Sequence, residues 1–145
     1  MADPFDDLYR ELILDHYRRP RNHGEMPDAP IRVEGLNPVC GDEIHLDMEV
    51  TGGELRDISF WGQGCSISQS SASMLTERLK GKPVEEAERI AAKVRAMLVD
   101  GALPDRELGD LEALEGVAKL PVRVKCALLC WNVLEQGLRE ATTAA

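Results

Sequence analysis

The chain has 145 residues, of which 43% are hydrophobic, and its formal net charge is −9 at pH 7. This acidic balance argues against a nucleic-acid-binding protein, which needs a basic face, and no apolar run approaches the roughly 20 residues that cross a membrane. We expect one domain over residues 1–145 and, because the acidic N-terminus lacks the layout of a secretory signal, a cytoplasmic protein.

The first half of the chain predicts one helix followed by a meander of about three strands. Apolar residues at helical spacing indicate a helix that starts near Asp3 and Pro4 and ends near Tyr17. Strand patterns follow at 31–36, 43–50 and 55–61. The second of these alternates apolar and polar residues, which is typical of a half-buried strand. Gly52 and Gly53 match the two-residue turn of a hairpin.

The second half predicts helices only, at 66–79, at 84–98, in a short segment around 108–114, and after Pro121. The last residues, 141–145, are expected to fray. A block of strands followed by a block of helices is the pattern of α+β proteins. We therefore expect an antiparallel sheet of about three strands with helices packed on one face.

Three of the four cysteines stand where the chain geometry changes. Cys40 lies in a turn, Cys65 follows a glycine-rich strand end just before a helix, and Cys126 comes early in the last helix. A helix N-terminus beside Cys65 favours its thiolate, and one tight turn could direct Cys40 and Asp42 at one point. Three thiolates and a carboxylate suit a tetrahedral zinc site. Without a Cys-x-x-Cys pair, however, unrelated buried cysteines are an equally good interpretation of the spacing.

Other candidate side chains have simpler interpretations. Cys130 follows Cys126 by one helical turn, and we interpret it as a core thiol. Arg123 and Lys125 are ordinary solvated helix charges, although a cation beside a thiolate would lower the pKa of that thiol. None of the three histidines is expected to bind a metal. His45 lies on the polar face of a predicted strand. His16 and His23 flank a basic loop, where a partner surface or packing is the simpler role.

Four segments, in order along the chain, resemble the iron–sulfur cluster assembly family of IscU and the NifU N-terminal domain. They are DHYRRPRNHG at 15–24, NPVCGD at 37–42, GQGCSIS at 62–68 and PVRVKC at 121–126. The similarity covers nearly the whole chain. It implies that Cys40, Cys65 and Cys126 are the ligands of a cluster or of zinc, and that Asp42 completes or modulates the site.

Within this family the chain resembles the SufU branch most. The IscU branch has a histidine immediately before the third cysteine, where this chain has Lys125, and it has a shorter helical stretch between Cys65 and Cys126. SufU proteins bind zinc and accept sulfur from a cysteine desulfurase. The resemblance therefore implies a Zn²⁺ site and sulfur transfer with Cys40 as the acceptor.

Two alternatives remain open. In the first, the chain is a scaffold on which a [2Fe–2S] cluster is built on the three cysteines and passed to apo iron–sulfur proteins or to downstream assembly proteins. In the second, it is a zinc-ordered interaction module without sulfur chemistry. The sulfur-transfer interpretation makes the chain a zinc-dependent sulfurtransferase that works with the desulfurase. The first alternative makes it an assembly scaffold.

Overall fold

The structure is a computed structural model that describes the backbone of residues 4–144 and the side chains of residues 9–142. The helix cap expected at Asp3 lies outside the described residues. In chain order the elements are α1 (Pro4–Arg18), β1 (Ile31–Asn37), β2 (Asp42–Thr51), β3 (Glu54–Gln63), α2 (Ser66–Leu79), β4 (Lys82–Pro83), α3 (Val84–Val99), the 3-10 helix η1 (Arg106–Lys119) and α4 (Pro121–Ala144).

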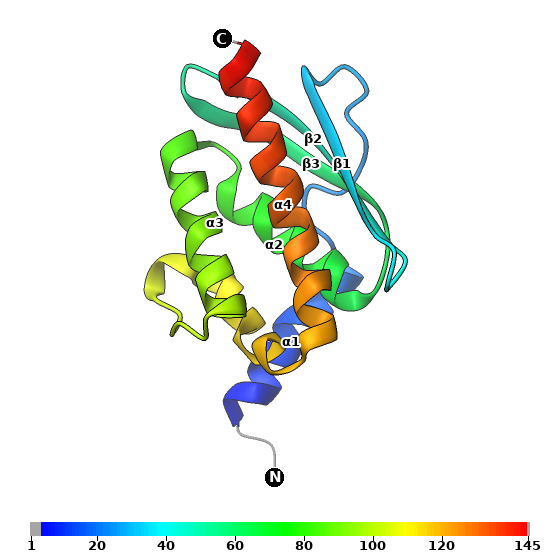
Figure 1. The fold of residues 1–145 in the computed structure, drawn as a ribbon, viewed down its shortest axis with the longest axis vertical. Coiled ribbons are helices and arrows are strands. Elements are labelled where there is room, and N and C mark those ends of the chain that lie inside the picture. The colour runs from blue at the N-terminus through cyan, green and yellow to red at the C-terminus, as the bar shows by residue number, and fades with distance from the viewer. Residues whose placement is uncertain (1–3, 145) are drawn as a thin grey trace.

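The strands form one antiparallel sheet in the order β1-β2-β3-β4, with the helices on one face (Figure 1). This confirms the predicted α+β class. The turn between β2 and β3 is also as predicted: Gly52 and Gly53 have φ angles of 62° and 77°, as a type I′ turn requires. The two-residue strand β4 is an addition. The sequence indicated only a break between helices there, but Gly81 N–H donates to the Leu55 carbonyl at 2.7 Å and adds this edge to the sheet.

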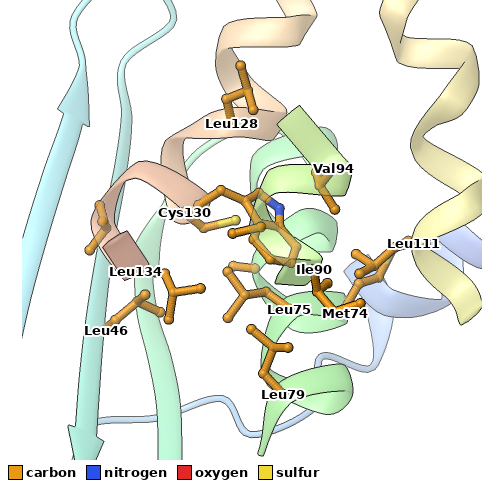
Figure 2. Packing of buried hydrophobic residues seen from close by; sticks show 14 of the residues in the cluster. Leu46, Met74, Leu75, Leu79, Ile90, Val94, Leu111, Leu128, Cys130 and Leu134 are labelled. Carbon is orange, nitrogen blue, oxygen red and sulfur yellow. The ribbon is translucent and has the colours of Figure 1, made fainter. Parts of the chain in front are cut away.

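The helices bury the apolar face of the sheet. α4 runs across β1 and β2, and α2 lies between α1 and α4 (Figure 1). Serine side chains allow close packing around α2, because each hydroxyl can satisfy a neighbouring carbonyl. Ser70 donates to the Ile13 carbonyl of α1 at 2.6 Å, and Ser71 donates to the Ala127 carbonyl of α4 at 2.8 Å. Aliphatic side chains from the sheet and the helices fill the remaining core together with the buried rings of Phe60 and Trp131, and Figure 2 shows part of this cluster.

Two segments differ from the sequence-based expectation. The short helix around 108–114 is a longer 3-10 segment, which bends where Gly109 adopts a φ of 57°. In the tail, which was expected to fray over 141–145, α4 continues to Ala144, and the Thr142 hydroxyl donates to the Leu138 carbonyl at 3.1 Å; Ala145 lies outside the described residues. Among the described helices, none is long and apolar enough to span a membrane.

Candidate thiol and metal site

The hairpin between β1 and β2 carries the first two site residues. Asn37 and Asp42 face each other as the last pair of the two strands, and the Asn37 carbonyl accepts from Gly41 N–H at 2.8 Å. Gly41 has a φ of 73°, a left-handed conformation that glycine adopts without strain. This turn places Cys40 at the tip of the hairpin, half-buried, and Asp42 at the start of β2 with 1% of its surface exposed.

The start of α2 brings in Cys65 and binds Asp42. Cys65 is the residue before the first turn, but its side chain makes no capping hydrogen bond. Instead, Asp42 Oδ1 accepts from Cys65 N–H at 3.0 Å and from the Ser68 hydroxyl at 3.3 Å. A carboxylate is favourable at a helix N-terminus, where backbone N–H groups lack partners. Asp42 thus supplies the cap from another element, and the Cys65 sulfur need not serve as one.

Cys126 of α4 completes the convergence. It is fully buried, and its Sγ lies 3.2 Å from Cys40 Sγ. The sulfur atoms of Cys40 and Cys126 and one carboxylate oxygen of Asp42 all lie within 4.8 Å of one another. The Cys65 thiol is outside that group of three but interacts with Cys126. Three of the four predicted ligands therefore meet at one point and the fourth lies beside them.

The charges at this point favour a bound cation. Burial, followed by the neighbouring Asp42 carboxylate and Cys40 sulfur, raises the pKa of the Cys126 thiol above its ordinary value, and the nearby Cys65 charge raises it further. Asp42 Oδ2 is buried without a hydrogen-bond partner in the structure. A divalent cation would favour deprotonated sulfur and give this oxygen a partner, so the donor set of thiols and one carboxylate fits zinc.

Comparison with known proteins places the chain in a family. Residues 8–141 match the family model described as NifU-like N terminal domain. The chain belongs to this family.

Similar proteins include a zinc-dependent sulfurtransferase SufU from Bacillus subtilis, 47% identical over 92% of this chain and 90% of the relative. An iron–sulfur cluster assembly scaffold protein IscU from Streptococcus pyogenes is 40% identical over 94% of this chain and 86% of the relative. A solved structure from Fervidobacterium islandicum, described as an iron–sulfur cluster assembly scaffold protein for the SUF system, superposes with a TM-score of 0.84. It is 34% identical and covers 88% of this chain and 94% of its own.

In this member of the NifU-like N-terminal family, the cation beside the thiols is Arg123. The charge of Cys65, together with hydrogen bonds to Cys65 and Cys126, raises the pKa of the Arg123 guanidinium. Arg123 and Lys125 are both exposed on α4, so exposure does not distinguish them. The sequence already favoured Arg123 over Lys125 as the cation beside Cys126. Arg123 lies three residues before Cys126 and so shares its helix face, whereas the adjacent Lys125 does not.

Cys130 does not belong to the site. It is fully buried, its sulfur lies 3.3 Å from the Ser71 hydroxyl, and burial raises its pKa to about 12. Figure 2 shows the side chain pointing into the core beside α2. The prediction of a core thiol is confirmed.

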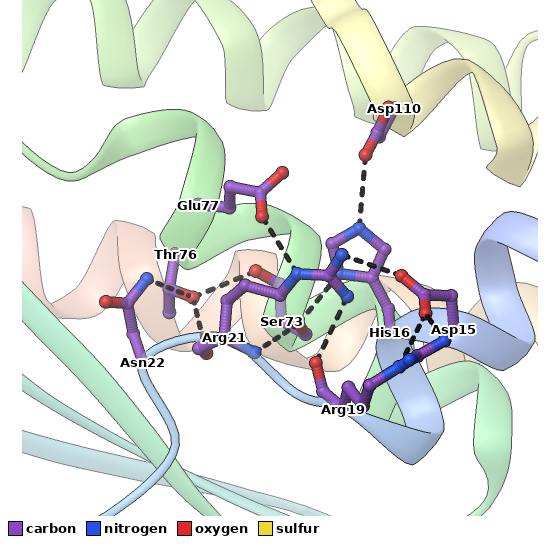
Figure 3. A network of polar contacts seen from close by, with 9 residues as sticks. All are labelled: Asp15, His16, Arg19, Arg21, Asn22, Ser73, Thr76, Glu77 and Asp110. Carbon is purple, nitrogen blue, oxygen red and sulfur yellow. Dashed lines mark hydrogen bonds and ion pairs between the residues drawn. The ribbon is translucent and has the colours of Figure 1, made fainter.

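The histidines also lie away from the thiols. His16 is fully buried, and its ring contacts Ser73 and Asp110 (Figure 3). Of the two roles expected for it, a partner surface or packing, the structure shows packing. His23 is exposed, with its ring centroid 5.0 Å from that of Phe60. His45 stacks on Trp61 on the polar face of the sheet and pairs with two glutamates.

Gly64 keeps the space that Asp42 needs. A Cβ at this position would lie 2.5 Å from Asp42 Oδ1 and 2.5 Å from the Ser68 hydroxyl. Because its φ is not positive, Gly64→Ala should leave the backbone in place and push the carboxylate aside. We expect zinc binding about 10–100-fold weaker, the usual effect of losing outer-shell support, as measured by competition with a chromogenic chelator. Gly116→Ala, where no atom lies within 4 Å, is the matched control, and equal affinities in the two variants would contradict this role.

Proposed function

We propose that the chain accepts sulfur, as a persulfide, from a cysteine desulfurase during iron–sulfur cluster assembly, at a zinc-binding site made of Cys40, Asp42, Cys65 and Cys126. The observation that carries this is the contact of two free thiols, 3.2 Å apart, beside a buried carboxylate oxygen that has no partner. The name of the Bacillus subtilis relative, a zinc-dependent sulfurtransferase, supports the same function.

Zinc bound here would hold the thiols deprotonated. The chain's own residues would position the carboxylate, offset the charge and present the attacking thiol. Asp42 stays fixed through its bonds to the start of α2, and Arg123 offsets the charge of Cys65 and Cys126. Cys40 and Cys65 are both half-buried, and we assign the attack to Cys40 because it lies on the tip of the β1–β2 hairpin.

Sulfur transfer is a thiol exchange. The Cys40 thiolate attacks the terminal sulfur of the donor's persulfide, and a new bond forms between Cys40 Sγ and that sulfur. The bond from the terminal sulfur to the donor's cysteine breaks, and the electron pair leaves with the donor thiolate. One thiolate and one persulfide enter and one of each leaves, so no oxidant or reductant is consumed.

The surroundings of the thiols suit a protein donor. Exposed apolar side chains flank the site residues along the chain: Leu36 and Val39 on the hairpin, and Leu120 and Val122 at the start of α4. Exposed apolar patches rimmed by polar residues are typical of protein interaction sites.

Cys40→Ala tests this function directly. The zinc-loaded variant is mixed with a cysteine desulfurase and isotope-labelled cysteine, and sulfur bound to the chain is measured after removal of small molecules. We expect transfer to fall to background, because the attacking thiolate is gone. Cys130→Ala removes a thiol from the core and should transfer sulfur like the unsubstituted chain. Full transfer to Cys40→Ala would reject Cys40 as acceptor.

A second candidate function is a scaffold for a [2Fe–2S] cluster that is then passed to apo-proteins. The observation that favours it is the 40% identity to a relative named as an IscU scaffold. In that case the cluster is cargo on Cys40, Cys65 and Cys126. Anaerobic assembly with iron and sulfide separates the two functions, since only a cluster gives visible absorption bands.

A further inference from the structure

The three thiols of the site receive unequal support from their surroundings. Cys126 Sγ faces the Asn37 amide, with Asn37 Nδ2 at 3.9 Å, and it also interacts with Arg123, Asp42 and Cys65. Cys65 has Arg123 beside it and the N-terminus of α2 behind it. For Cys40, by contrast, the only polar contact made by its sulfur within the described side chains is with Cys126.

Asn37 connects the two ends of this arrangement. Its side chain is 7% exposed, and both of its polar atoms are used. The oxygen Oδ1 accepts from Val39 N–H at 3.3 Å inside the loop that carries Cys40, while Nδ2 donates to Cys126 Sγ. A single amide therefore fixes the shape of the hairpin tip and holds the sulfur across from it.

An N–H group that donates to a sulfur atom occupies one of its lone pairs and fixes the atom in place, so that sulfur is less free to attack a donor. Cys126 is in addition fully buried, whereas Cys40 is half-buried on a loop. We propose that Asn37 is a positioning residue that holds the Cys126 sulfur and thereby directs incoming sulfur to Cys40. This rests on the proposed function for the donor reaction, but the difference in reactivity between the two thiols can be measured without any donor.

Two substitutions distinguish the two roles of Asn37, donation to Cys126 and support of the turn. Asn37→Asp keeps the shape and the oxygen that accepts Val39 N–H but replaces the donor by a second oxygen. Asn37→Ser keeps a short acceptor for the turn and cannot reach Cys126. Asn132→Ser, at an exposed position of α4, is the matched control.

The zinc-loaded proteins are treated at one fixed pH with less than one equivalent of iodoacetamide, and the alkylated fraction at each cysteine is found by peptide mass spectrometry. We expect the unsubstituted chain and Asn132→Ser to react at Cys40 at least tenfold more than at Cys126. In both Asn37 variants this ratio should fall at least fivefold while zinc content stays at one per chain, a change that a merely structural role would not produce. Equal reaction of Cys40 and Cys126 in the unsubstituted chain, or an unchanged ratio in a folded variant, would overturn the proposal.

A single turnover with a cysteine desulfurase then locates the persulfide. Sulfur should be found on Cys40 in the unsubstituted chain and on both Cys40 and Cys126 in Asn37→Ser. If the alkylation ratio shifts but no chain receives sulfur, the role of Asn37 stands and the proposed sulfur transfer fails. If sulfur is received at Cys40 alone in every variant, the role of Asn37 fails and the transfer stands.

Discussion

Removal of Zn²⁺ by a chelator is expected to lower the midpoint of thermal unfolding by roughly 10 °C. The proposed ligands come from the β1–β2 hairpin, the start of α2 and the first turns of α4, so one ion would join three elements that are far apart in sequence. Free zinc at about 100–1,000 times its dissociation constant stabilises the folded state by about 3–4 kcal/mol, and a domain of this size shifts by about 2–4 °C per kcal/mol. Without the ion, Asp42 Oδ2 is again a buried oxygen without a partner.

Melting curves with chelator, and again after zinc is restored, measure this effect. Cys130→Ala should show the same chelator shift as the unsubstituted chain, because its thiol lies outside the site. Cys40→Ala lacks one ligand, so its midpoint should be low from the start and should move little on chelation. A midpoint of the unsubstituted chain that does not respond to zinc would show that the ion does not join these elements.

The parts of the fold that the sequence predicted well are those fixed by local chemistry. α2 begins and ends at the predicted residues, 66 and 79, because glycines precede it and Gly81 follows it closely. The turn at Gly52 and Gly53 follows from their left-handed backbone. β4 could not be predicted, because two residues pair as a strand only where an edge such as the start of β3 is already in place.

The site divides in the same way. Cys40 and Asp42 share one turn, so their proximity was visible in the spacing across Gly41. The second role of Asp42, as the cap of α2, joins residues 23 and 26 positions apart, and no local pattern contains it. Asn37 and Ser68 were missed for that reason. The only signal for Asn37 was its place at the start of a turn, where asparagine is common without any functional role.

His16→Ala is expected to lower the free energy of unfolding by about 3 kcal/mol, the range for losing a large buried side chain together with its hydrogen bonds. The ring is fully buried between three elements, with Nδ1 2.8 Å from the Ser73 hydroxyl of α2 and Nε2 3.2 Å from Asp110 Oδ2 of η1 (Figure 3). Its burial could have been predicted, because it falls three and four residues after the apolar Ile13 and Leu12. Its partner Asp110, which lies 94 residues away, could not.

Chemical denaturation of His16→Ala, Ser73→Ala and the double variant measures this network. Because the two side chains contact each other, the double variant should lose less stability than the sum of the single variants, by about 0.5–3 kcal/mol. His23→Ala removes an exposed ring and should cost less than about 1 kcal/mol, which makes it the matched control. Zinc binding should be unchanged in all four variants, since none of these side chains is a proposed ligand. A His16→Ala protein as stable as His23→Ala would mean that the buried ring does not hold α1, α2 and η1 together.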